Sequence, residues 1–295
     1  KLTCKFFSNL VSSLVGMYKD DIEKLKQALE SMCKHGLLEN AFEILNMINH
    51  DSSIPEEIYV QILKLLGYFI QYSGDLTLRV IHMGIIKIIN ATLQLESDVE
   101  NVMALGNANT PGGGAAVLSR ANSTSASASH GKKSFSQIYQ ILSLLKSVLP
   151  VAPDDYTGSP EMRHIMLEKI AIYENNPELL GHLMHTLFPT LFKLYGIHLN
   201  VAIRHSTLDI IETLLHFSTP DFIHKTTRIE TMCNLILDLL TGRDFVAIQT
   251  GLNMVISLSE KLYQVYHIPF VREGIIEEVK KLTTSHHLNE LDNCG

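Results

Sequence analysis

Apolar residues recur along most of this chain at intervals of three and four, the spacing that places them on one face of an α-helix. One phrase of this kind appears three times, as KHGLLENAFEIL from Lys34, HMGIIKIINATL from His82 and REGIIEEVKKL from Arg272. Each copy has a glycine, two aliphatic residues directly after it and an apolar residue five places after it. The pattern predicts a helix that ends at the glycine and is followed by an amphipathic helix.

The spacing of the three glycines predicts a repeat. Gly36 and Gly84 are 48 residues apart, and the 190 residues from Gly84 to Gly274 fit about four further units of similar length. Armadillo and HEAT solenoids repeat roughly every 40–47 residues. We therefore expect an all-α protein, an armadillo- or HEAT-like α-solenoid of stacked helical repeats. An irregular helical bundle is the alternative.

The same periodicity predicts the positions of the helices, and helical patterning is already under way at Phe6 and Phe7. Because the first residue is Lys1 and no secretory n-region or cleavage site precedes this pattern, we expect the chain to be a fragment of a longer protein. The expected helices span residues 22–33, 37–48, 55–72, 76–83, 85–95, 134–150, 162–173, 178–195, 199–217, 226–240, 245–263 and 275–282.

One segment interrupts the helical pattern. From about Leu105 to Ser134, Gly, Ala, Ser, Thr and Asn replace the aliphatic residues, so the segment has too little apolar surface to offset the entropy of ordering it. We expect a disordered insertion in a loop, and its dense serines make it a candidate for regulation by phosphorylation. The predicted organisation is repeats at 1–104, the insertion at 105–134, continuation of the same repeats at 135–285 and a polar tail at 286–295.

Composition and charge narrow the functional classes. The chain has 295 residues, is 46% hydrophobic and carries a net charge of −7, which gives no general attraction to nucleic acid or to an anionic membrane. Its apolar stretches are too short and too often interrupted by polar residues to span a bilayer. The cysteines Cys4, Cys33, Cys233 and Cys294 never form CxxC, which favours a reduced intracellular protein over a disulfide scaffold.

No motif of the sequence indicates catalytic chemistry. The 14 histidines form no HExxH or comparable metal-binding pattern, so we expect no metal site and no cofactor. The triple glycine at Gly112–Gly114 lacks the strand, the lysine and the helix of a phosphate-binding loop. A complete active site within this chain is therefore not expected.

Several helical segments resemble a known family in order along the chain. The most specific of them are IRHSTL around Arg204 and VYHIPFVREGII around Arg272 and Gly274. They resemble the armadillo region of HECT-type E3 ubiquitin ligases of the ubiquitin-fusion-degradation and thyroid-receptor-interactor type. The resemblance extends over nearly the whole chain, although most of the matching residues are packing residues.

The resemblance implies a role in recognition. In that family a HECT domain, outside this chain, takes ubiquitin from an E2 as a cysteine thioester and passes it to a substrate lysine. The armadillo region engages substrates that carry degradation signals or fused ubiquitin, and the ligases act largely in the nucleus, possibly also in the cytoplasm. None of the four cysteines here lies in a HECT-like catalytic loop. The resemblance thus implies a substrate-recognition region whose partners are protein substrates and, through the HECT domain, E2-ubiquitin.

A second hypothesis comes from another functional class. A non-enzymatic armadillo adaptor or transport receptor would bind extended peptides on a concave face. Such receptors usually carry regularly spaced Asn and Trp on successive third helices, and this chain has no Trp.

The candidate partner-binding residues are polar or amphipathic positions on the presumed third helices, whose long faces usually meet partners in armadillo proteins. An ordinary solvated helix face is the alternative for the charged positions. The candidates are Gln61, Tyr68, Arg204, His205, Asp209 and Asn253.

Overall fold

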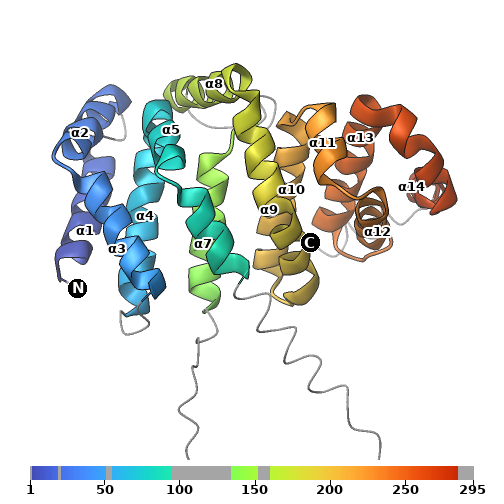
Figure 1. Ribbon diagram of the computed structural model, residues 1–295, viewed down its shortest axis with the longest axis horizontal. Coiled ribbons are helices and arrows are strands. Elements are labelled where there is room, and N and C mark those ends of the chain that lie inside the picture. Colours follow the sequence, from blue (N-terminus) through green and yellow to red (C-terminus); the bar gives the residue numbers. More distant parts are fainter. Residues whose placement is uncertain (1, 19–20, 51–54, 95–133, 152–159, 285–295) are drawn as a thin grey trace, which may run out of the picture.

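The structure is a computed structural model that describes residues 2–18, 21–50, 55–94, 134–151 and 160–284. Within these ranges every regular element is an α-helix, so the predicted all-α class is confirmed (Figure 1). The helices are α1 (Leu2–Met17), α2 (Ile22–Lys34), α3 (Leu37–His50), α4 (Glu56–Tyr72), α5 (Gly74–His82), an unlabelled helix Ile85–Gln94, α7 (Phe135–Val148), α8 (Pro160–Asn175), α9 (Pro177–Ile197), α10 (Val201–Phe217), α11 (Pro220–Thr226), α12 (Ile229–Leu240), α13 (Phe245–Arg272) and α14 (Ile275–Thr284).

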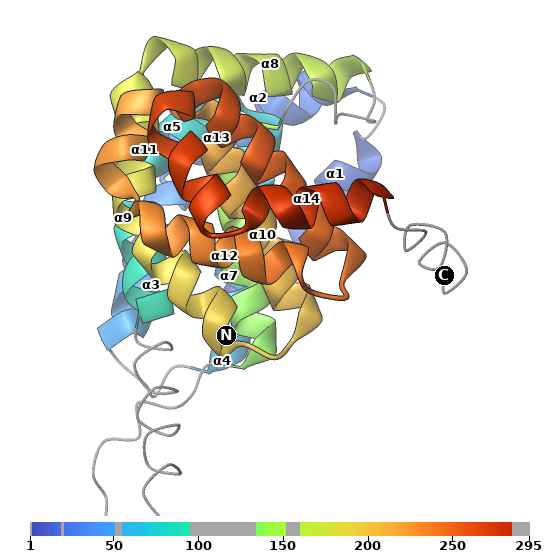
Figure 2. The ribbon, with the colours of Figure 1, turned by 90° about the vertical axis from the view of Figure 1, so that its right-hand side faces the viewer.

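The helices recur in threes. α1 packs against α4, α4 against α7, α7 against α10, and α10 against α13. We call these five the third helices. From α4 onward, the helix directly before each third helix is called a second helix, and the helix before that is called a first helix. Seen along the array, α3 and α9 lie on one side and α1 lies on the other, while α8 runs across the top of the view (Figure 2). The third helices therefore form a layer of their own.

The three glycine turns are confirmed. Gly36, Gly84 and Gly274 have φ values of 79°, 93° and 80°, the left-handed conformation that an L-residue adopts only at a cost. Each lies two residues after one helix and directly before the next, and its N–H donates to the carbonyl three residues earlier. The recurring phrase therefore marks the turn from a first to a second helix.

Two features of the C-terminal part differ from the prediction. Leu262 interrupts α13 with φ −138° and ψ 39°, so the helix expected to end at Tyr263 continues, after a kink, to Arg272. The part after the kink occupies the position of a first helix. The short helix α11 was not predicted, because seven residues are too few for a helical period to stand out.

The expected number of units was also wrong. The first-to-second-helix turns that follow Gly84 lie near Asn176, near Thr227 and at Gly274, which makes three steps instead of four. The estimate failed because it divided the 190 residues evenly, although the predicted insertion falls within one step.

Most of the predicted insertion, at 105–133, and the predicted tail at 286–295 lie outside the described residues. Ser134, the last residue assigned to the insertion, is the N-cap of α7. It caps the helix by accepting from the Gln137 N–H, and the Gln137 side chain accepts from the Ser134 N–H in return. The Ser134 hydroxyl also bonds to Glu56 in α4.

The buried side chains form one connected core from Val11 in α1 to Ile275 in α14. Among the described residues, no single helix is long and apolar enough to cross a membrane. Only α5 and the helix Ile85–Gln94 taken together reach that length and composition, with a bend of 62° between them. Buried core helices of globular proteins also have this composition, and Val80, Ile85 and Leu93 are fully buried here.

Replacing Gly84 by alanine tests the left-handed turn. No atom lies within 4 Å of the added Cβ, so the loss comes from the backbone conformation alone. We expect unfolding free energy to fall by about 1–2 kcal/mol in urea titrations. Gly196→Ala is the matched control, since its Cβ also meets nothing and Gly196 lies inside α9. It should leave stability unchanged or raise it by up to about 1 kcal/mol. Equal effects at both positions would contradict the turn assignment.

Candidate functional site

The outer polar positions of α10 connect it to its neighbours in the third-helix layer. Asp209 forms an ion pair with Lys146 of α7, and both side chains are about half exposed. Toward α13, the Asn253 side-chain amide donates to Glu212 Oε1 at 2.7 Å. Two of the predicted partner-binding residues, Asp209 and Asn253, thus lie on the third-helix layer and join adjacent helices.

His205 joins α10 to the start of α13. Its Nε2 lies 2.5 Å from Oδ2 of Asp244, the residue that caps α13 by accepting from the N–H groups of Val246 and Ala247. Burial raises the pKa of Asp244, but the bonds from His205 and the two backbone groups outweigh burial and hold that pKa below its ordinary value. The contact is therefore a polar junction between two units.

Arg204 faces its own unit. Its guanidinium lies 4.5 Å from the centre of the Tyr195 ring in α9 and donates to the Tyr195 hydroxyl at 2.6 Å. Tyr195 is only 8% exposed, so Arg204 contributes to the packing of α9 on α10. A substitution at Arg204 would change this packing as well as the surface charge.

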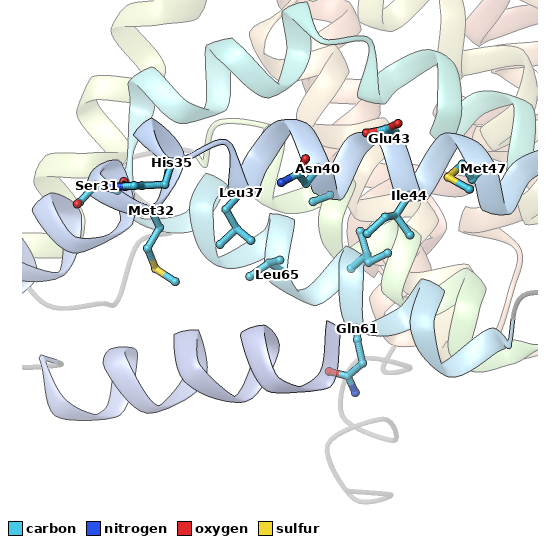
Figure 3. A pocket seen from close by; sticks show the side chains of 12 residues that line it. Ser31, Met32, His35, Leu37, Asn40, Glu43, Ile44, Met47, Gln61 and Leu65 are labelled. Atoms are coloured by element: carbon cyan, nitrogen blue, oxygen red, sulfur yellow. The ribbon is translucent and has the colours of Figure 1, made fainter. Parts of the chain in front are cut away.

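The two candidates on α4 lie apart from those on α10 and α13. Tyr68 is half-buried and packs against the core. Gln61 lines an apolar cavity of about 650 Å³ between α2, α3 and α4, into which Leu37, Ile44 and Leu65 point (Figure 3). This cavity adjoins α3, the earliest of the second helices, so it lies at the α1 end of the array.

A smaller cavity, of about 350 Å³, lies between α4, α7, α8 and α10, and the sequence prediction missed it. The spacing of Tyr139, Ser143 and Lys146 places them on one face of α7, and that pattern was the only available signal. Lys169, which completes the lining, comes from α8, and its proximity follows only from the packing of the helices.

Cys33 and Cys233 are buried, and burial raises the pKa of each thiol to about 11. Both are protonated at neutral pH and inaccessible, so neither can act as a thiolate nucleophile. The Cys4 side chain and Cys294 lie outside the described residues. In the part of the chain that the structure describes, no three His, Cys, Asp or Glu side chains are grouped so as to hold a metal ion.

No family model matches the chain. Its similar curated proteins include E3 ubiquitin-protein ligase UPL3 of Arabidopsis thaliana, 23% identical over 87% of this chain, and UPL4 of the same plant, 21% identical over 90%. E3 ubiquitin-protein ligase TRIP12 of Danio rerio is 28% identical over 46% of the chain. The resemblance to E3 ubiquitin ligases is confirmed. The chain spans only 7% to 16% of the length of these relatives.

Replacing Asp244 by alanine tests the junction between α10 and α13. We expect the unfolding free energy to fall by about 1 kcal/mol, because the cap of α13 and the bond from His205 are lost together. Asp244→Asn keeps an acceptor for the cap and should cost less. Asp238→Asn, on the exposed side of α12, is the control and should have no measurable effect.

The same variants have a defined pH dependence. A carboxylate with a lowered folded-state pKa stabilises the protein above its ordinary value of 3.8, and that contribution is lost as the pH falls through the folded-state pKa. The gap in unfolding free energy between the wild type and Asp244→Asn should therefore be full above about pH 5 and shrink as the pH falls below 3.8 through the folded-state pKa. A gap that does not change with pH would contradict the assignment.

Proposed function

We propose that this chain is the substrate-recognition region of an E3 ubiquitin ligase and that its helices form an armadillo-like solenoid. The observation that carries the proposal is the similarity to E3 ubiquitin-protein ligases over as much as 90% of the chain. Similarity at this level covers a small part of each relative, so it supports a region within a ligase.

The helix arrangement supports the armadillo-like part of the proposal. Three helices recur per unit, and every third helix packs against the next one of its series. The turns between first and second helices are 48 residues apart from Gly36 to Gly84, 51 from Asn176 to Thr227 and 47 from Thr227 to Gly274. These steps lie at or slightly above the usual armadillo and HEAT period.

In this proposal recognition and chemistry belong to different parts of the protein. Neither of the two described cysteines is suited to forming a thioester. We propose that ubiquitin transfer takes place in a HECT domain outside this chain, which meets E2-ubiquitin. The third-helix layer holds the substrate, so that its lysine meets the thioester at a high effective concentration. We propose that the protein acts on substrates with degradation signals or fused ubiquitin, in the nucleus, with the cytoplasm as a second location.

Removing residues 1–295 from the full-length protein tests this role. In a reaction with E1, E2, ubiquitin and a ubiquitin-fused substrate, we expect the deletion to abolish substrate modification, because the substrate is no longer held near the thioester. Autoubiquitination should continue, which controls for the integrity of the catalytic domain. Undiminished substrate modification would contradict a recognition role. A full-length protein that forms no ubiquitin thioester would exclude the ligase hypothesis and favour the peptide-binding adaptor.

A further inference from the structure

The cavity of about 350 Å³ opens on the third-helix layer. Gln71 of α4, Ser143 of α7 and Ser206 of α10 line it, so it spans three successive third helices. α8 closes one end with Met162, Ile165, Met166 and Lys169. Ligand-binding pockets in proteins begin at about this size.

Lys169 is the unusual member of this lining. It is 8% exposed, and its ammonium donates to the Ser147 carbonyl at 2.7 Å. That carbonyl lies in the last turn of α7, the negative end of the helix dipole, where a cation is favoured. Among the described residues, no carboxylate lies within ion-pair distance of this ammonium, although an ammonium has three donors.

The charge of Lys169 persists at neutral pH. Burial lowers the pKa of the ammonium to about 8, which is still above 7, so most molecules carry the positive charge. A buried cation with a single hydrogen bond is costly, and an anion in the adjoining cavity would offset that cost. The charge of Lys169 therefore favours the binding of an anionic ligand in the cavity.

The other polar groups of the cavity are suited to an anion. Tyr139, Ser143 and Ser206 present hydroxyls, and Lys146 adds a second ammonium, already paired with Asp209. The Ser147 hydroxyl donates a hydrogen bond to the Ser143 carbonyl at 3.0 Å. None of the described residues that line the cavity is an Asp or a Glu, so no carboxylate of the lining would repel an anion.

We propose that this cavity binds one acidic side chain of a peptide ligand, with the carboxylate or phosphate group at Lys169. The apolar lining, which includes Leu149, Ile165 and Met166, would hold an apolar residue next to the acidic one. The choice of a peptide as ligand rests on the proposed function, since a substrate-recognition surface meets protein. The site adds to that function a preference for an acidic residue beside an apolar one.

Fluorescence polarisation with three degenerate nonapeptide pools tests the site directly. The pools carry aspartate, phosphoserine or serine at the central position and are identical elsewhere. We expect the aspartate or the phosphoserine pool to bind the chain about tenfold more tightly than the serine pool, because a charge-assisted hydrogen bond replaces a neutral one. The stronger of the two identifies the anion. Equal binding of all three pools would overturn the proposal.

Two variants locate the binding. Lys169→Met keeps the side-chain length, removes the charge and should reduce acidic-pool binding to the level of the serine pool. Lys87→Met, an exposed lysine on the helix Ile85–Gln94, is the control and should bind as the wild type does. Ser206→Glu should also abolish acidic-pool binding, because it places a carboxylate on the cavity lining beside the two lysines.

The Glu variant leaves Lys169 in place and decides the question if Lys169→Met fails to fold. Acidic-pool binding that survives in Ser206→Glu would overturn the proposal. The outcome is separable from that of the ubiquitination experiment, because peptide binding is measured without E1, E2 or ubiquitin. If the wild-type protein shows no preference for the acidic pools but still recognises its substrate, the anion site is contradicted and the proposed function is not. If the acidic pools bind but the full-length protein forms no ubiquitin thioester, the anion site is supported and the ligase function is contradicted.

Discussion

The packing of each third helix between two others is the constraint on which the rest of the structure depends. A helix such as α4 carries more apolar surface than one neighbour can cover, and it packs against both α1 and α7. Leu66 and Phe69 of α4 and Leu145 of α7 are completely buried in this way. Burial of one such side chain contributes about 1.5–3 kcal/mol, so a unit removed from its neighbours would lose much of its stability.

Polar contacts accompany this packing at successive junctions. Each is at the surface or half-buried and individually worth at most about 1 kcal/mol, so the contacts do not hold the layer together. They link successive third helices at the polar surface of the layer. The contacts are Glu56 with Ser134 from α4 to α7, Lys146 with Asp209 from α7 to α10, and Glu212 with Asn253 from α10 to α13.

The sequence predicts those parts of the fold that depend on local chemistry. A glycine that ends one helix and precedes an apolar pair is sufficient to locate the turns at Gly36, Gly84 and Gly274. Two features escaped prediction for a physical reason. The part of α13 after the kink at Leu262 contains Pro269, a residue that usually breaks a helix, and α11 is too short to show a period. The number of units was wrong because the 190 residues were divided evenly, without subtracting the insertion that the sequence predicts at 105–134.

The candidate residues likewise have some features that the sequence predicts and others that depend on the packing of separate helices. That Asp209 and Asn253 lie on third helices follows from helical periodicity, because it concerns one helix at a time. Their partners, and the contact of Arg204 with Tyr195, depend on how separate helices pack, and no spacing in the sequence predicts them. The cavity at Lys169 is the extreme case, since four helices are needed to form it.

The division of labour proposed for this protein follows from the same packing. A third helix that packs between two others offers fixed positions for the side chains on its outer face, which reduces the entropy lost when a ligand binds. Burial also keeps the thiols of Cys33 on α2 and Cys233 on α12 protonated and out of reach, so neither thiol is suited to thioester chemistry. Lys169 of α8 illustrates a role in ligand binding that the packing of these helices permits. Burial and the bond to the Ser147 carbonyl restrict this cation to one place, and an acidic side chain that reached it would meet a stronger attraction than an exposed lysine offers.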